Sequence, residues 1–302
     1  MELRTLRYFL AVAKEQSITH AAESLHLTQP NLSRQLKELE DELGTSLFHR
    51  GRRVTLTEEG LILRKRAQEI MELLDKAKSE ITASIESVGG NVSIGCAETD
   101  AMRILMQAMK TLRTTHPDIH FHITSGHEEV VAERLDRGLL DFGVFMEPTD
   151  MQKYDFIQLP AADTWGILMR KDDPLAEHIS ITPKDLMTLP LISSNQVLFQ
   201  NQFSGWLGGT DKRVNIIATY NLLFNASLMV EEGIGYALCL DRIIPTTADR
   251  PLCFRPLEPK VEAGICIGWK KYSKFSKASE LFLDTLHQVV HELRESETAE
   301  PL

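Results

Sequence analysis

The sequence predicts a multidomain α+β protein with three parts: an N-terminal winged helix-turn-helix, a long linker helix and a C-terminal two-lobed α/β domain. Three observations predict this fold class. Short helical patterns joined by a tight turn precede a basic, strand-like segment. An apolar repeat with a 3.5-residue period follows, and strand and helix patterns then alternate almost to the end. We place the parts at residues 1–60, 57–90 and 91–302.

Composition limits what the chain can be. Its 302 residues, 43% hydrophobic and 25% charged, are typical of a globular protein with about two or three domains. No window approaches the roughly 18 consecutive apolar residues of a membrane span, and the N-terminus lacks the apolar run of a signal peptide. We therefore expect a cytoplasmic protein with no membrane partner. The scattered cysteines indicate reduced core thiols rather than a zinc site or a disulfide framework: Cys96, Cys239, Cys253 and Cys266.

Charge is divided unevenly along the chain. The formal net charge is −10, but residues 1–66 carry 11 Lys and Arg against 9 Asp and Glu, whereas the rest carries 22 against 34. The acidity therefore belongs to whatever follows residue 66. That part should stay away from phosphates.

Residues 1–27 predict two helices. Apolar residues recur at helical spacing from Leu3 to Glu15, and Ser17 offers a side-chain oxygen that can cap a second helix over Ile18 to Leu25. The small pair Ala21-Ala22 would let another helix pack closely, although good helix propensity explains it equally well.

The third helix has two different faces. Thr28 can cap it, Pro30 suits its first turn, and Gly44 can end it. The opposite side from the apolar stripe holds hydrogen-bonding and basic groups in its first half and acids in its second. Because acids repel phosphates, the N-terminal half should enter the major groove of DNA. The apolar stripe, spaced 4, 3 and 4, predicts the buried face: Leu32, Leu36, Leu39 and Leu43.

Side chains in this N-terminal half suit DNA recognition. Gln29 and Arg34 have the donors and acceptors that pair with base edges. Asn31, Ser33 and Lys37 are equally suited to phosphate oxygens, and the sequence does not separate the two roles. The competing interpretation is the solvated face of an ordinary three-helix bundle.

A basic turn beside this helix favours the DNA interpretation. Arg50, Arg52 and Arg53 precede a strand-like run from Val54 to Thr57. Together they predict a wing placed for phosphates or the minor groove.

These N-terminal motifs carry a resemblance to a known family. They are Ala21-Ala22-x-x-Leu25, Gln29-Pro30-x-x-Ser33-Arg34-Gln35, Leu39-Glu40-x-x-Leu43-Gly44-x-x-Leu47-Phe48-x-Arg50-x-x-Arg53 and Leu56-Thr57-x-x-Gly60. Over about 60 residues without a gap they resemble the signature of LysR-type transcriptional regulators, with Glu59 as a small departure where the family most often has Ala. The resemblance implies that Gln29, Pro30, Ser33 and Arg34 face the operator, and that Arg50 and Arg53 belong to the wing.

A long helix is expected to link the two ends and to dimerise. Thr57 begins a capping pattern, and no proline follows before Val88. The apolar positions alternate between spacings of 4 and 3, which is typical of a coiled-coil seam, although a helix docked on its own chain is the alternative. Gly89-Gly90 then breaks the helix at a hinge. The seam comprises Leu63, Ala67, Ile70, Leu74, Ala77, Ile81, Ser84 and Val88.

Residues 91–302 alternate between strand and helix, which predicts mostly parallel sheets covered by helices. The late strand and helix should return to complete the first lobe, giving lobe I at about 91–161 and 267–295 and lobe II at about 162–266. The two crossovers fall near residues 160–163 and 263–267, as in periplasmic-binding-protein-like sensors, which the family's C-terminal part resembles. The expected elements are strands at 92–96, 119–125, 142–145, 165–170, 191–192, 214–219, 236–240 and 264–269, and helices at 102–113, 129–137, 183–187, 195–207, 222–232 and 275–295.

A small effector should bind beyond the carboxyl ends of these strands. Each candidate also has a plainer role, since a serine at a helix start is first of all an N-cap. If Glu98 and Asp100 face the cleft, they argue against a simple inorganic anion and leave room for an amine or a neutral ligand; they can equally point to solvent. The candidates are Thr99, Asp100, Ser125 and Phe145 in lobe I, and Ser193, Ser194, Thr219 and Asn221 in lobe II.

The sequence motifs do not indicate an enzyme. The sequence has no P-loop, no GxGxxG between strand and helix, no GxSxG and no HExxH, so we expect no catalytic residues and no cofactor. His120 and His122 share a strand face but lack a third metal ligand, so no metal site is expected.

The function expected is a bacterial LysR-type regulator that reads promoter DNA as a homodimer or homotetramer, is switched by a small molecule, and has RNA polymerase as a further partner. The alternatives are a DNA-tethered enzyme and a ligand-independent architectural DNA protein. The effector, the operator and the choice between activation and repression stay open.

Overall fold

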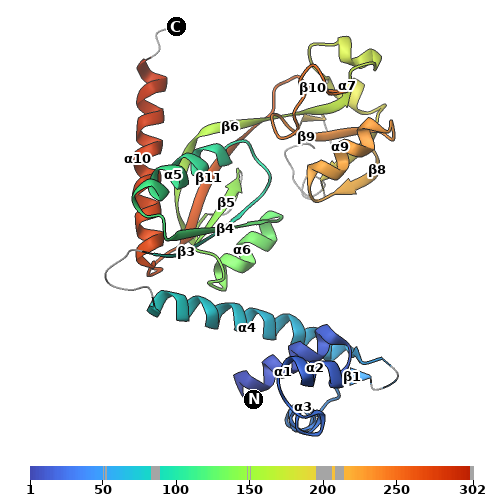
Figure 1. Ribbon diagram of the computed structural model, residues 1–302. Coiled ribbons are helices and arrows are strands. Elements are labelled where there is room, and N and C mark those ends of the chain that lie inside the picture. Colours follow the sequence, from blue (N-terminus) through green and yellow to red (C-terminus); the bar gives the residue numbers. More distant parts are fainter. Residues whose placement is uncertain are drawn as a thin grey trace. The chain divides into compact units, whose positions relative to one another are not determined.

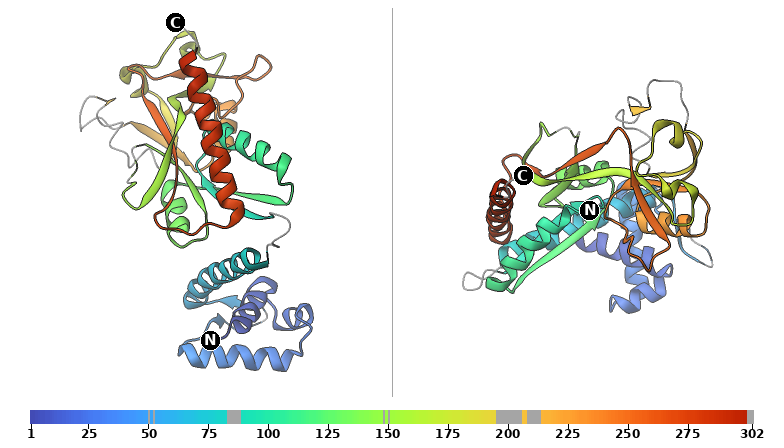
Figure 2. Two further views of the ribbon diagram at one scale, coloured as in Figure 1. Left: turned by 90° about the vertical axis from the view of Figure 1, so that its left-hand side faces the viewer. Right: turned by 90° about the horizontal axis from the view of Figure 1, so that it is seen from above.

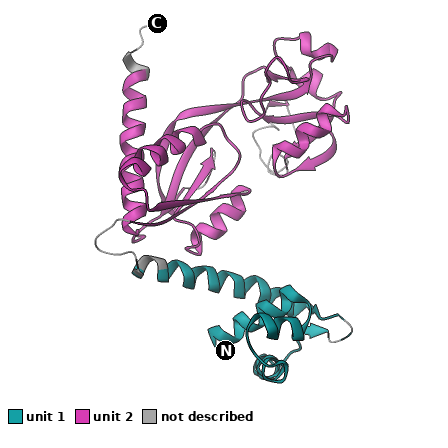
Figure 3. Ribbon diagram, viewed as in Figure 1, with its two compact units in different colours: residues 1–82 teal, residues 83–302 magenta. Residues whose placement is uncertain are grey.

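The computed structural model describes residues 1–49, 51, 53–82, 89–147, 149, 151–194, 206–207 and 214–299. The chain forms two compact units, Met1–Thr82 and Ala83–Leu302 (Figure 3). Each is described separately. Among the expected features, Arg50, Arg52, the end of the linker seam at Ser84 and Val88, and most of the helix at 195–207 lie outside the described residues.

The first unit contains the three helices and short hairpin that the sequence predicts (Figure 1). Its elements are α1 (Leu3–Glu15), α2 (Ile18–Ser24), α3 (Gln29–Leu43), β1 (Phe48–His49), β2 (Thr55–Leu56) and α4 (Glu58–Thr82). Ser17 caps α2 as expected, because its hydroxyl accepts a hydrogen bond from the His20 amide at 3.3 Å. Thr28 occupies the N-cap position of α3, but its side chain makes no capping hydrogen bond, so the expectation of side-chain capping there is wrong.

The leucine stripe of α3 forms the core of this unit, with one exception. Leu32, Leu36 and Leu39 are at most 2% exposed, whereas Leu43 is 42% exposed. Gly44 ends the helix with a φ of +70°, which a glycine adopts without strain. The chain then reverses and brings Leu47 into the core. The prediction that Leu43 is buried is therefore wrong.

The predicted coiled-coil seam of α4 is divided between two environments. Leu63, Ala67 and Ile70 pack on the core formed by α1 and α3. Farther along, Ala77 is exposed and Ile81 is 83% exposed. The first half of the described seam is therefore docked on its own chain, and pairing with a partner helix stays a prediction for the second half.

The second unit consists of two α/β lobes. Its elements are β3 (Gly90–Cys96), α5 (Met102–Thr115), β4 (Ile119–Ser125), α6 (Glu128–Asp136), β5 (Phe142–Met146), β6 (Tyr154–Arg170), the 3-10 helix η1 (Pro174–Glu177), α7 (Pro183–Leu186), β7 (Pro190–Ser194), β8 (Asn215–Tyr220), α9 (Leu223–Glu231), β9 (Tyr236–Leu240), β10 (Leu252–Pro256), β11 (Glu262–Lys270) and α10 (Lys277–Ala299).

Lobe I is built on the strand order β4-β3-β5-β11-β6. β3 runs parallel to β4 and β5, and β11 runs antiparallel to β5 and β6. α5 and α10 lie side by side on one face of the sheet, and α6 packs on the other (Figures 1 and 2). The late strand and helix thus return to lobe I, as the sequence predicts.

Lobe II continues from the same long strand. The second half of β6 pairs with β9 and β10, and the order then runs β9-β7-β8. α9 covers one face, and η1 and α7 cover the other. The sequence predicts only Trp165–Arg170 of β6, and it gives no prediction of β10, a short strand that pairs with β6 and ends at Pro256. Among the described residues, no helix has both the length and the apolarity needed to cross a bilayer.

Candidate nucleic-acid interface and interlobe cavity

The first half of α3 presents most of the predicted DNA-contacting residues on one exposed face. Ser33 is half-buried at the flank of this face, beside the leucine stripe. The exposed set is Gln29, Pro30, Asn31, Arg34 and Lys37.

The Arg34 side chain is held only weakly. Its Nη2 donates to the Asn31 Oδ1 at 3.5 Å, and its Nε lies 3.8 Å from the Glu38 Oε1, with both charged side chains largely exposed. Exposed ion pairs of this kind contribute little stability. The guanidinium can therefore leave Glu38 for a base edge or a phosphate at small cost.

The wing is anchored to the helical bundle at its base. β1 and β2 pair Phe48 with Leu56 and His49 with Thr55. The Val54 amide donates to the Gln16 carbonyl at the end of α1 at 3.1 Å. Arg53, next to this anchor, is exposed.

Glu40 has a structural role that the sequence pattern did not predict. Its carboxylate is buried, and it accepts hydrogen bonds from the amides of Leu47 at 2.8 Å and Phe48 at 3.3 Å. By charge alone, Glu40 is one of the acids in the second half of α3 that repel phosphates. Its position on the helix, four residues after Leu36 and at the edge of the buried stripe, is the feature of the sequence that could have indicated its burial. Glu40 therefore fixes where the wing leaves α3.

Gly60 is a second residue that positions the wing. A Cβ atom added there would lie 2.2 Å from the carbonyl oxygen of Leu47. The first turn of α4 is so close to the chain before β1 that any side chain at this position would force the backbone to shift. Thr57 holds the same junction, because its hydroxyl donates to the Ser46 carbonyl at 2.8 Å and accepts from the Gly60 amide at 3.0 Å.

A small cavity lies between the two lobes of the second unit, with a volume of about 50 Å³. Of the predicted effector-binding residues, Ser194 and Asn221 line it. Lobe I contributes Ala97, Glu98, Gly126, His127 and Met146, and lobe II contributes Trp165, Ser194, Tyr220, Asn221, Leu222, Leu223, Leu240 and Ile243. The lining thus comes from the carboxyl ends of β3, β4 and β5 in lobe I and, in lobe II, from β6, the carboxyl ends of β7, β8 and β9, and the start of α9.

The other candidates from the sequence lie outside this lining. Ser125 and Thr219 are exposed. Ser193 is 1% exposed, and Phe145 is buried in lobe I with its ring stacked on Tyr154 at 5.6 Å. Thr99 and Asp100 contact the strand that joins the lobes and the end of β9.

These two residues belong to a cluster around Arg242, directly after β9. The Arg242 guanidinium lies 3.5 Å from Asp100, 3.4 Å from Asp163 and 3.1 Å from Asp241, and it donates to the Ala162 carbonyl at 3.0 Å. Asp163 has no exposed surface and accepts a hydrogen bond from the Thr99 hydroxyl. Burial raises the pKa of the Asp163 carboxyl, and the Thr99 hydrogen bond and Arg242 partly oppose that rise.

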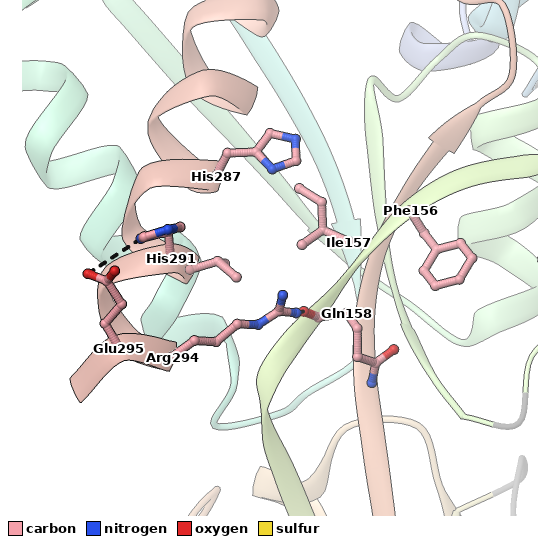
Figure 4. A pocket seen from close by; sticks show the side chains of 8 residues that line it. Phe156, Ile157, Gln158, His287, His291, Arg294 and Glu295 are labelled. Atoms are coloured by element: carbon pink, nitrogen blue, oxygen red, sulfur yellow. Dashed lines mark hydrogen bonds and ion pairs between the residues drawn. The ribbon is translucent and has the colours of Figure 1, made fainter. Parts of the chain in front are cut away.

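A larger hollow, about 620 Å³, lies between β6 and α10 (Figure 4). Phe156 and Gln158 line it from β6, and His287, His291 and Arg294 line it from α10. Arg294 donates to the Gln158 carbonyl at 2.6 Å. This hollow is on the outside of lobe I, away from the carboxyl ends of β3, β4 and β5.

The cysteines are all buried and unpaired with one another. Burial, together with the nearby Glu147 and Glu128, raises the pKa of the Cys266 thiol to about 11. Burial also raises the pKa of Cys96, Cys239 and Cys253. These thiols are therefore protonated at neutral pH.

Family models match both units. Residues 3–61 match the model described as the bacterial regulatory helix-turn-helix protein, lysR family. Residues 86–290 match the LysR substrate binding domain. The two matches together span nearly the whole described chain.

Curated relatives agree with these matches. The chain is 28% identical to the Hca operon transcriptional activator HcaR of Escherichia coli over 90% of this chain and 92% of that protein. It is 35% identical to the HTH-type transcriptional regulator BsdA of Bacillus subtilis over 64% of this chain and 66% of that one. A hydrogen peroxide-inducible genes activator of Pectobacterium carotovorum is 27% identical over 95% of this chain and 96% of that one.

Solved structures share the fold. CbnR in complex with its target DNA superposes with a TM-score of 0.73 at 19% identity, covering 96% of this chain and all of that one. Full-length OxyR of Pseudomonas aeruginosa gives a TM-score of 0.56 at 24% identity, covering 95% and 99%. These likenesses confirm the predicted fold class of a helix-turn-helix joined to a two-lobed α/β domain.

Proposed function

The chain belongs to the LysR family of bacterial transcriptional regulators, and from this premise we propose how its parts act. It is a transcription regulator, not an enzyme, with a DNA-binding domain and an effector-binding domain. We assign DNA binding to residues 1–60, linkage and dimerisation to 57–90, and effector binding to 91–302, with lobe I at about 91–161 and 267–295 and lobe II at about 162–266. As a regulator of promoters it works in the cytoplasm, where RNA polymerase is a further partner.

The distribution of side chains on α3 carries the DNA-binding proposal. One face of the helix is buried by Leu32, Leu36 and Leu39, while the hydrogen-bonding groups of the first half are exposed. A recognition helix in the major groove contacts bases with its N-terminal residues. We infer that Arg34 and Gln29 contact bases and that Asn31, Ser33, Lys37 and the wing arginines Arg50, Arg52 and Arg53 contact phosphates, with Pro30 at the groove wall.

Substitution of two arginines tests this assignment. Arg34→Ala should weaken binding to the footprinted operator by about 1–3 kcal/mol, because a bidentate base contact discriminates by that amount, and should relax specificity at one base pair. Arg53→Ala should weaken binding to operator and random DNA alike and should lower the salt slope by about one. Fluorescence anisotropy with operator and random DNA, repeated over a series of salt concentrations, measures both effects.

If both variants bound the operator as tightly as the parent chain, the groove assignment would be wrong. Asp41→Ala, on the exposed second half of α3, is the matched control. It should retain full specificity, because that half of the helix is proposed to lie outside the groove.

Exposed apolar surface supports the proposal of a homo-oligomer. α9 buries Leu223, Ala226 and Val230, yet Phe224 is 62% exposed and Leu228 is 43% exposed on its other side. A helix that is apolar on both sides is normally covered on both. We propose that a second copy covers this face and that the exposed half of α4 adds to the contact, giving a homodimer that can pair into a homotetramer.

The interlobe cavity is the proposed effector site. Its polar groups, Glu98, His127, Ser194 and Asn221, converge with apolar walls, as small-molecule sites usually do. One relative's name refers to hydrogen peroxide, but the protonated, buried thiols of this chain do not favour peroxide chemistry. We therefore propose a non-redox small molecule, and a thermal-shift screen of metabolites on the full chain would identify it.

A further inference from the structure

Three consecutive polar residues after β3 connect the two lobes. Glu98, Thr99 and Asp100 lie in the short connection between β3 and α5 of lobe I. Each uses its side chain to contact lobe II or the strand that joins the lobes. We call residues 98–100 the latch segment.

Glu98 contacts the start of a lobe II helix. Its carboxylate accepts a hydrogen bond from the Leu223 amide at 2.5 Å, across 125 residues of sequence. Leu223 is the first residue of α9, whose N-cap residue, Leu222, provides no side-chain cap. The first amides of a helix lack intrahelical acceptors, and a carboxylate there is favoured by the helix dipole. Glu98 of one lobe therefore caps a helix of the other.

The remaining two residues reinforce this contact. The Thr99 hydroxyl donates to the carboxylate of Asp163, in the middle of β6. Asp100 pairs with Arg242 of lobe II at 3.5 Å. Asp100 also accepts from Arg103 of its own lobe at 2.7 Å, so its position is fixed from both sides.

The cavity beside these contacts is small. Small-molecule sites usually measure about 300–1,000 Å³, whereas the cavity beside Glu98 has about 50 Å³. A metabolite can enter only if the lobes move apart there. Such movement lengthens the distance between Glu98 and Leu223, because one belongs to each lobe.

We propose that the latch segment holds the two lobes together, so that a movement of the lobes that admits an effector must break the Glu98–Leu223 contact. This inference rests on the proposed effector site for its regulatory meaning, but the latch itself does not depend on it. When only a small fraction of a protein is in the conformation that binds a ligand, its apparent dissociation constant is the intrinsic one divided by that fraction. The latch therefore sets both the effector concentration that is needed and the resting conformation of the regulator.

Hydrogen–deuterium exchange of the full chain, resolved to single amides and without DNA or ligand, tests the latch directly. The Leu223 amide has no acceptor within α9, so its protection reports the contact with Glu98. Glu98→Ala should accelerate exchange of this amide by about tenfold or more. Glu98→Gln keeps an acceptor of the same length without the charge, and its exchange rate should fall between those of the parent and the alanine variant. Glu129→Ala, an exposed glutamate of the same lobe, is the matched control and should leave the rate unchanged.

Asp100→Asn is a second test of the latch if the Glu98→Ala variant does not fold. It weakens the pairing with Arg242 without removing side-chain volume, and it should accelerate Leu223 exchange by a few-fold. Equal Leu223 exchange rates in the parent, Glu98→Gln and Asp100→Asn chains would overturn the latch. Since no DNA or effector takes part, that result would leave the proposed regulatory function standing, whereas the operator binding of Arg34→Ala and Arg53→Ala concerns that function alone.

Discussion

Two buried carboxylates lie where parts of this fold are connected. Glu40 joins α3 to the wing through two backbone amides, and Asp163 lies inside the strand that joins the lobes. A carboxylate removed from water is costly unless hydrogen bonds and opposite charges compensate it. Glu40 accepts hydrogen bonds from two backbone amides, and Asp163 accepts one from the Thr99 hydroxyl and lies 3.4 Å from Arg242.

The pH dependence of stability should reveal Asp163. Its carboxylate contacts the Thr99 hydroxyl and faces Arg242, Asp241 and Asp100. Burial raises its pKa in the folded state, so the folded state holds this proton more tightly than the unfolded state does. As pH rises from the ordinary aspartate value of about 3.9 through the raised pKa, the parent chain should lose stability relative to Asp163→Asn. The loss should be about 1.4 kcal/mol for each pH unit that separates the folded and unfolded pKa values.

Urea unfolding between about pH 4 and pH 8 measures this difference. All three tryptophans, Trp165, Trp206 and Trp269, belong to the second unit, so their fluorescence reports on that unit alone. The exposed Asp155→Asn serves as the control. If the difference in the free energy of unfolding between the parent chain and Asp163→Asn stayed constant over this pH range, the prediction would be contradicted.

At the scale of elements, the wing depends on a close approach of backbones. Gly60 lies in the first turn of α4, where an added Cβ would meet the Leu47 carbonyl at 2.2 Å. This contact involves backbone atoms, which cannot rotate away as a side chain can. A side chain at this position would therefore displace the start of α4 from the base of the wing.

Gly60→Ala should accordingly destabilise the first unit by about 1–3 kcal/mol or more, as overpacking does. Gly44→Ala is the comparison: nothing lies within 4 Å of its added Cβ, and only the positive φ is strained, at a cost of about 1–2 kcal/mol. The Thr57 amide donates a hydrogen bond to the Leu47 carbonyl at 3.0 Å. Its hydrogen–deuterium exchange rate therefore reports whether the junction between α4 and the wing is intact. Faster Thr57 exchange in Gly44→Ala than in Gly60→Ala would show that the close approach is unimportant.

Elements with a local signal could be predicted from the sequence, and those set by distant partners could not. The spacing of Leu32, Leu36 and Leu39 predicts α3 because burial follows the helical period. The same reasoning fails at Leu43, where Gly44 turns the chain, and in the first half of β6, where Pro160 interrupts the apolar alternation. The lining of the interlobe cavity joins the end of β3 to the start of α9, across 125 residues at the Glu98–Leu223 contact, and no local pattern brings such segments together.

At the scale of the whole molecule, charge is distributed unevenly along the chain, with net +2 over residues 1–66 and net −12 over the rest. The N-terminal residues carry a slight excess of positive charge and the long C-terminal part is strongly acidic, so only the first is attracted to phosphates. The proposed homodimer would double the recognition helices and thereby the length of DNA that is read. Burial of the exposed apolar surface of the second unit can stabilise such an assembly.

Charge placed on α9 should therefore dissociate the proposed oligomer. The double variant Phe224→Lys with Leu228→Lys converts the exposed face of α9 from apolar to cationic while leaving Leu223, Ala226 and Val230 in the core. Light scattering coupled to size-exclusion chromatography should show a lower mass than for the parent chain, and operator affinity should fall because two linked sites become one.

Phe156→Lys is the matched control, since Phe156 is 49% exposed on β6 in the hollow beside α10 (Figure 4). Its mass should equal that of the parent chain, because an apolar residue exposed singly is ordinary surface. Dissociation by Phe156→Lys together with an unchanged mass for the α9 double variant would move the interface from α9 to the β6–α10 hollow.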